Sequence, residues 1–135
     1  MFDDIAPGFL DCLGEVPAGE EGPATIGEVD IGHLFPNTDP TWRNAPSRIF
    51  LEEAARRVQA RGGRIVNIDA TLIAEQPKIY PHITAMKAHI ATALGIPPGK
   101  VGIKATTNET MGFVGREEGI AAMAVASVNL PETEE

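Results

Sequence analysis

Hydrophobic and polar positions follow different periods in different parts of the chain. Residues 64–73 (RIVNIDATLI) alternate between apolar and polar side chains, which predicts a strand with one dry face and one polar face. A shorter alternation predicts a second strand over residues 101–105. Residues 120–130 are nearly all apolar, which predicts a third strand in a central position of the sheet.

Two other segments carry the spacing of amphipathic helices. The first begins at Ser47, which is expected to cap it, and ends at the Gly62-Gly63 pair. The second covers residues 82–94 and ends at Gly95. Its apolar stripe consists of Ile83, Met86, Ile90 and Leu94. On the first helix, an exposed charge ladder is expected from Arg48, Glu52 and Arg56.

Three segments between these elements are expected to be loops. Residues 14–27 are rich in Gly, Pro and Glu, residues 30–40 in Gly, Pro, Asn and Asp, and residues 74–81 contain two prolines. Proline keeps the preceding residue extended, so the 74–81 loop has main-chain groups free to read a nucleobase edge. The order of elements predicts an α/β fold in one domain, with an atypical segment over 1–27 and the foldable core over 28–131.

The charge of the chain is unevenly distributed. Its net charge is −8. Residues 1–30 contain eight acidic side chains and no Lys or Arg, so the remaining residues are neutral overall. A neutral core argues against a nucleic-acid partner, which would need a basic face. No apolar run approaches the ~20 residues of a membrane helix, and no secretory signal is recognisable. The single cysteine, Cys12, fits a reducing compartment, so we expect the cytoplasm.

The stretch of residues 101–119 carries the strongest candidate chemistry. After its strand come two hydroxyls, an amide and a carboxylate, namely Thr106, Thr107, Asn108 and Glu109, followed by glycines and Arg116. Hydroxyls, exposed backbone N–H groups and an arginine suit a phosphorylated ligand, and a carboxylate suits a divalent cation that bridges two phosphates. An ordinary β-turn with a solvated polar tip explains the same residues equally well.

Three stretches of the chain resemble one known family. KATTNETMGFVGREEGIA is similar to the C-terminal signature of the 2-C-methyl-D-erythritol 2,4-cyclodiphosphate synthases, and DIGHLFPNTDP (30–40) and QPKIYPH (76–82) agree in order and spacing. The resemblance covers about residues 26–130. It implies a mixed sheet with helices on one side, a homotrimer whose sheets face a central axis, and active sites between adjacent subunits.

The resemblance also implies contacts to a cytidine diphosphate-type substrate. In the first loop, Asp30 and Gly32 would meet the ribose, while Ile31 and Phe35 would contact the erythritol part. Asn37 stands where the family usually has an aspartate that meets the erythritol hydroxyls. An amide can still hydrogen-bond those hydroxyls.

The other two stretches supply the remaining residues of the implied site. The 74–81 loop forms the cytosine pocket of the family, which implicates Ala74, Pro77, Lys78 and Ile79. The substrate set is completed by Thr106, Thr107, Phe113 and Arg116. Thr107, Glu109 and Arg116 would act in catalysis, with Mg²⁺ or Mn²⁺ held by Glu109. The implied reaction uses the substrate's own 2-phosphate to attack the β-phosphorus, so it needs positioning and charge neutralisation rather than a protein nucleophile.

Zinc is expected for the family, but its ligands are not identifiable in this sequence. The family holds zinc with an Asp-x-His pair near the N-terminus and a further histidine. Here the histidines are His33, His82 and His89, and the last two would lie about 10.5 Å apart along one helix, too far to share an ion. The alternative function is therefore a cytidine-nucleotide-binding trimer with impaired or no turnover.

Overall fold

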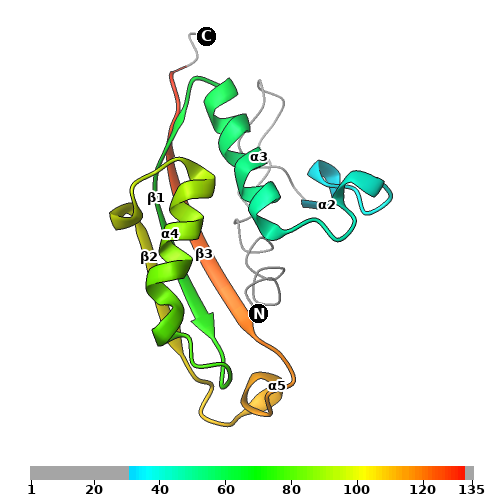
Figure 1. Ribbon diagram of the computed structural model, residues 1–135, viewed down its shortest axis with the longest axis vertical. Coiled ribbons are helices and arrows are strands. Elements are labelled where there is room, and N and C mark those ends of the chain that lie inside the picture. Colours follow the sequence, from blue (N-terminus) through cyan, green and yellow to red (C-terminus); the bar gives the residue numbers. More distant parts are fainter. Residues whose placement is uncertain (1–30, 133–135) are drawn as a thin grey trace.

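A three-stranded mixed sheet forms the framework of the molecule (Figure 1). The computed structural model describes residues 31–132, so predictions for Asp30 and for the acidic segment over 1–27 lie outside the described part. The strands are β1 (Arg64–Ile73), β2 (Val101–Thr106) and β3 (Ala121–Asn129), in the order β2-β1-β3. β1 pairs in parallel with β2 and antiparallel with β3. The predicted α/β fold and the strand over 64–73 are confirmed.

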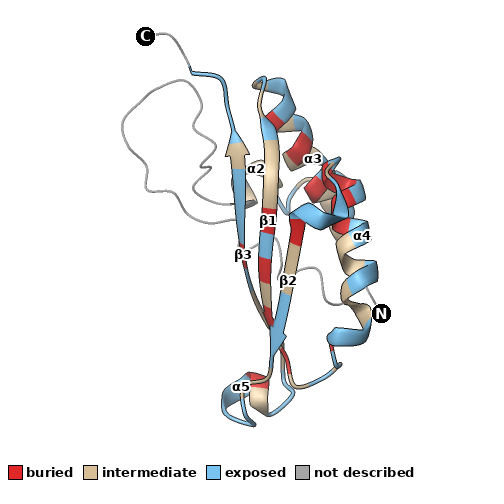
Figure 2. Cartoon of the chain, turned by 90° about the vertical axis from the view of Figure 1, so that its left-hand side faces the viewer, coloured by how far each residue is buried: buried red, intermediate tan, exposed pale blue. Residues whose placement is uncertain are grey.

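Two long helices, α3 (Ser47–Ala60) and α4 (Ile83–Leu94), cover one side of this sheet (Figure 2). Because β1 and β2 are parallel, the chain must cross over between them, and α4 lies in that connection. The shorter elements are α2 (Ile31–Leu34), α5 (Gly112–Gly115) and the 3-10 turns η1 (Pro40–Trp42), η2 (Tyr80–His82) and η3 (Pro98–Lys100).

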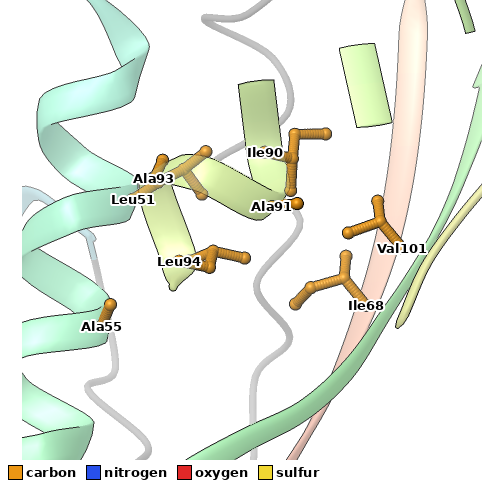
Figure 3. Packing of buried hydrophobic residues seen from close by; sticks show 8 residues of the cluster. All are labelled: Leu51, Ala55, Ile68, Ile90, Ala91, Ala93, Leu94 and Val101. Atoms are coloured by element: carbon orange, nitrogen blue, oxygen red, sulfur yellow. The ribbon is translucent and has the colours of Figure 1, made fainter. Parts of the chain in front are cut away.

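The core lies between the helices and the sheet. Its larger cluster joins both helices to β1 and β2, as Figure 3 shows, through Leu51, Ala55, Ile68, Ile90, Ala91, Ala93, Leu94 and Val101. A second cluster lies towards the other end of the sheet and contains Leu72, Ala74 and Ile79. Its partly buried neighbours include Ile120 and Ala122, so it connects the end of β1 to the start of β3. This second cluster supports the loops described below.

The predicted position of the third strand was wrong. β3 lies at an edge of the sheet, and β1 occupies the centre. Ala124 is buried towards the helices, whereas Met123 and Val125 have 58% and 69% of their surface exposed. Both faces of β3 are therefore apolar, but only one of them is covered by described residues. A strand with two apolar faces has the same sequence pattern as a central strand, which explains the wrong prediction.

Several local boundaries also differ from the predictions. The segment 30–40, expected to be a loop, contains α2, and Asp39 caps the following turn by accepting the N–H of Thr41 at 2.9 Å. That bond lowers the pKa of Asp39. Ser47 is the first residue of α3 rather than its cap, which is Pro46. Proline is compatible with this position because it has no N–H to satisfy.

The charge ladder on α3 is confirmed for one pair and wrong for the other. Arg48 contacts Glu52 at 2.5 Å, as expected for an i,i+4 pair. Arg56 instead pairs with Glu53, which also accepts a hydrogen bond from Arg57. The hydrogen bonds from Arg56 and Arg57 lower the pKa of Glu53 to about 2.

Candidate functional site at the carboxyl edge of the parallel strands

Two loops meet where β1 and β2 end. The parallel register places Ile73 opposite Thr106, so the loop over 74–79 and the loop over 107–111 both start at the carboxyl ends of these neighbouring strands. The N–H of Ala74 donates to the carbonyl of Thr106 at 2.9 Å, which continues the pairing beyond β1. In α/β proteins, ligands bind preferentially at the carboxyl ends of parallel strands. The geometry therefore brings together two of the three predicted groups of site residues.

Glu75 connects the two loops directly. Its Oε1 atom accepts the N–H of Asn108 at 3.0 Å and the N–H of Thr110 at 2.9 Å. Glu75 was not predicted as a site residue, although a carboxylate just after a buried strand was a usable signal. Because these two amides already donate to Glu75, they are not available to a phosphate in this conformation.

The 107–111 loop has an unusual backbone conformation. Glu109 and Thr110 adopt left-handed φ angles of 52° and 62°, each costing roughly 1–2 kcal/mol for a residue with a side chain. The hydroxyl of Thr107 contacts Glu109 Oε1 at 3.3 Å and accepts the N–H of Glu109 at the same distance. The amide of Asn108 donates to the carbonyl of Met111 at 2.8 Å. As a result, Thr107 and Glu109 lie side by side, with the Glu109 carboxylate exposed.

The helix α5 packs against the backbone of the 107–111 loop. Val114 is the buried residue of α5, with 3% of its surface exposed. A Cβ on Gly115 would lie 2.1 Å from the backbone carbon of Thr110, so the two backbones are in direct contact. Phe113 is 54% exposed, and its ring lies against Gly119. The glycines of the predicted motif thus allow close packing of backbone.

Arg116 is held by an acidic neighbour in this structure. Its guanidinium donates to both carboxylate oxygens of Glu118, at 2.8 and 3.1 Å. This hydrogen bonding raises the pKa of Arg116. A phosphate that approaches Arg116 would therefore have to share or displace the carboxylate of Glu118.

In the 74–79 loop, the buried and exposed residues have different roles. Ala74 and Ile79 are 5% and 4% exposed, and their side chains belong to the second core cluster. The carbonyl of Ile79 already accepts the N–H of His82 at 2.9 Å. Lys78 is exposed and Pro77 is half-buried. Any ligand contact from Ala74 or Ile79 must therefore come from their remaining main-chain groups.

The site residues predicted from the first loop lie elsewhere in the structure; residues 31–37 are called the Phe35 segment below. Phe35 packs edge-on against Trp42 and Phe50, with ring centroids 4.9 and 4.8 Å apart. Figure 1 shows the α2 segment, which contains Gly32 and precedes Phe35 and Asn37, well separated from α5. Asn37 is exposed, and the side chain of Ile31 lies outside the described part. Within one chain, the Phe35 segment therefore does not lie next to the 74–79 and 107–111 loops.

The donor set of the loops suits a hard cation. Mg²⁺ is usually bound through one or two carboxylates together with substrate phosphates, and Glu109 offers an exposed carboxylate beside a threonine hydroxyl. Among residues 31–132, no three His, Cys, Asp or Glu side chains gather as a metal site. The described residues thus offer oxygen donors for a divalent cation that is shared with a ligand. Within the same residues, no helix is long and apolar enough to cross a membrane.

Fold and site together define an α/β protein whose mixed sheet carries two hydrogen-bonded loops at the edge where its parallel strands end. The model of the YgbB family matches residues 23–129, and the chain belongs to that family. The resemblance to cyclodiphosphate synthases is thereby confirmed.

Named relatives and solved structures agree with this assignment. The chain is 58% identical over 108 residues to the bifunctional enzyme IspD/IspF of Mesorhizobium japonicum, covering 80% of this chain and 26% of that protein. It thus spans about a quarter of the length of the curated relatives it matches. The bifunctional IspDF of Campylobacter jejuni is similar in structure, with a TM-score of 0.70 and 36% identity over 76% of this chain and 28% of that one. A CDP-bound 2C-methyl-D-erythritol-2,4-cyclodiphosphate synthase has a TM-score of 0.62 and 33% identity, over 74% of this chain and 64% of the other.

Proposed function

We propose that this chain is a 2-C-methyl-D-erythritol 2,4-cyclodiphosphate synthase, which cyclises 4-diphosphocytidyl-2-C-methyl-D-erythritol 2-phosphate and releases CMP. The observation that carries the proposal is the convergence of the 74–79 and 107–111 loops, joined through Glu75, at one edge of the sheet. Membership of the YgbB family and similarity to a CDP-bound synthase support it. The relatives are named as enzymes, which favours turnover over a binding protein without activity.

In the proposed reaction, an oxygen of the 2-phosphate forms a bond to the β-phosphorus. The bond from that phosphorus to the oxygen bridging to the cytidylate breaks, and CMP leaves with that oxygen. Thr106 and Thr107 would donate hydroxyl hydrogen bonds to the diphosphate, and Arg116 would add positive charge. A divalent cation held by Glu109 would supply charge neutralisation. The protein's main task is to bring the two reacting groups together.

The base of the substrate would lie against the 74–79 loop. Main-chain groups of this loop and the exposed Lys78 are its available polar contacts, because the side chains of Ala74 and Ile79 are buried. Pro77 would limit the shape of the pocket, and Phe113, half exposed on α5, would border the ligand. A cytoplasmic location forms part of the proposal, since the chain has a single cysteine.

We further propose that the active site lies between neighbouring subunits of a homotrimer. The separation of the Phe35 segment from the two loops in one chain supports this arrangement (Figure 1). The sheet face opposite the helices supports it too, because it carries the exposed Met123 and Val125 beside the ion pair of Lys104 with Asp69. A neighbouring copy would cover these apolar side chains and bring Gly32, Phe35 and Asn37 to the loops.

The proposal is tested by incubating the protein with the substrate and Mg²⁺ or Mn²⁺. We expect stoichiometric release of CMP, a cyclic diphosphate among the phosphorus resonances, and loss of both on chelation of the metal. Binding of CDP should exceed that of UDP, since exchange of a donor for an acceptor on the base leaves buried groups unpaired. Cytidine binding without CMP release would contradict the enzymatic function and support the binding trimer.

A further inference from the structure

Glu75 touches both halves of the candidate site without belonging to either predicted set. It lies in the 74–79 loop, two residues after the end of β1, and its carboxylate reaches across to the 107–111 loop. Both hydrogen bonds end on a single oxygen, Oε1, and both come from main-chain amides rather than side chains. Hydrogen bonds between a carboxylate and backbone N–H groups are about twice as strong as neutral ones.

The loop that Glu75 holds cannot keep its conformation by local preference alone. Glu109 and Thr110 are consecutive residues with left-handed φ angles, and neither is glycine. Strained backbone of this kind persists only when surrounding contacts determine it. Two contacts do so for Thr110: its N–H is bound by Glu75, and its backbone lies directly against Gly115.

The held conformation sets the direction of the groups that would meet a diphosphate. Glu75 binds the amides on either side of Glu109, those of Asn108 and Thr110. The orientation of Glu109, and of the Thr107 hydroxyl that contacts it, therefore depends on these bonds. The 74–79 loop is held in a different way, by the burial of Ala74 and Ile79 in the core and by the hydrogen bond from Ala74 to the carbonyl of Thr106.

We infer that Glu75 is a positioning residue, which holds the 107–111 loop in the conformation that receives a diphosphate and its divalent cation. The inference rests on the proposed function for the identity of the ligand. Because Glu75 is part of the loop assigned to the base, it also links the two halves of the site mechanically. Its effect should appear in diphosphate affinity and much less in affinity for a monophosphate.

Binding measurements on three variants test this inference, with CMP and with CDP plus Mg²⁺ as probes. Glu75→Ala should weaken CDP binding by about tenfold or more and CMP binding by less than about threefold, as expected for the loss of charge-assisted hydrogen bonds to one loop. Glu75→Gln keeps an oxygen acceptor at the same reach and should restore most of the CDP affinity. Glu52→Ala removes an exposed carboxylate on α3 and should leave both affinities unchanged.

Amide hydrogen exchange provides a second readout that needs no ligand. In Glu75→Ala, the amides of Asn108 and Thr110 should exchange faster, while those of β1 and α4 keep their protection and show that the protein is folded. Unchanged exchange at these two amides, or an equal loss of CMP and CDP affinity, would overturn the inference and leave the proposed function intact. Failure of the unaltered chain to bind either nucleotide would overturn the proposed function, and the assignment of Glu75 to diphosphate binding with it.

Discussion

At the scale of single residues, Gly115 is the glycine least able to accept a side chain among those in residues 31–132. An added Cβ would lie 2.1 Å from the Thr110 backbone carbon, where only movement of main chain can relieve the overlap. We expect Gly115→Ala to lower the free energy of unfolding by about 1–3 kcal/mol and to weaken binding of CDP with Mg²⁺. Calorimetry and titration would measure the two effects.

The matched control for that substitution is Gly99→Ala. Gly99 has open space around its Cβ position and no left-handed φ angle. The control should change neither stability nor affinity appreciably. If Gly115→Ala behaves in the same way, the contact between α5 and the loop has no part in shaping the site.

Glu109 permits a second test at this scale. Its exposed carboxylate is the proposed cation ligand, so Glu109→Gln should reduce the Mg²⁺-dependent part of CDP affinity by about tenfold or more and leave CMP affinity nearly unchanged. Titrations with and without Mg²⁺ would separate the two contributions. Thr107→Ala should weaken CDP binding at either condition, because a hydroxyl donor is lost. A Glu109→Gln variant that retains the full effect of Mg²⁺ would place the cation elsewhere.

At the scale of elements, the ion pairs of α3 have a pH signature. Glu53 accepts hydrogen bonds from Arg56 and Arg57, and its pKa falls from 4.5 to about 2 on folding. A lowered carboxyl pKa means that the stabilisation is complete above about pH 4.5 and is lost as the pH falls through about 2. Glu53→Gln should therefore cost about 0.5–1 kcal/mol near neutral pH. The difference from the unaltered chain should vanish at the acid end of a series of thermal melts.

Glu52→Gln serves as the comparison on the same helix. Glu52 has one partner, Arg48, and its side chain is 43% exposed, against 18% for Glu53. Its substitution should cost less near neutral pH. Equal costs for the two variants would show that the double pairing of Glu53 adds nothing to the stability of α3.

Elements with a clear period, and the strand predicted from the apolar run over 120–130, could be predicted from the sequence, whereas the shortest elements could not. The alternation over 64–73 gave the bounds of β1, and Gly95 ended α4 in the left-handed conformation that favours glycine. α5 has four residues, two of them glycines, and so has no period to detect. The edge position of β3 depends on pairing partners, which an apolar run does not specify.

The same limit applies to the site. The motif over 104–121 marked Thr107, Glu109 and Arg116 because their chemistry is visible in the sequence. Glu75 escaped because its two partners lie 33 and 35 residues further along the chain and contribute only main-chain amides. Every residue other than proline has a main-chain N–H, so residue types do not show which amides a carboxylate will bind. Parallel pairing of β1 with β2 is what brings them within reach.

At the scale of the whole molecule, a site shared between subunits can be tested by mixing variants. Asn37→Lys should disable the Phe35 segment, and Glu109→Gln should disable the loop. If each site uses one segment from one subunit and the loop from its neighbour, random mixed trimers should regain about a quarter of the unaltered activity. Sedimentation should give a species near three times 14.3 kDa. Activity that stays at the mean of the two variants would place the whole site within one chain.

The aromatic contacts of Phe35 have a practical consequence for such experiments. Trp42 is the only tryptophan of the chain, and its ring lies 4.9 Å from that of Phe35 and 5.8 Å from that of Phe50. Indole emission responds to the polarity and packing around the ring, so excitation of this one residue monitors the segment assigned to the erythritol part. The complete substrate should shift the emission in an assembled trimer, whereas CMP alone should leave it unchanged. The fluorescence of Trp42 would therefore report binding of the erythritol part of the substrate, which cytidine nucleotides lack.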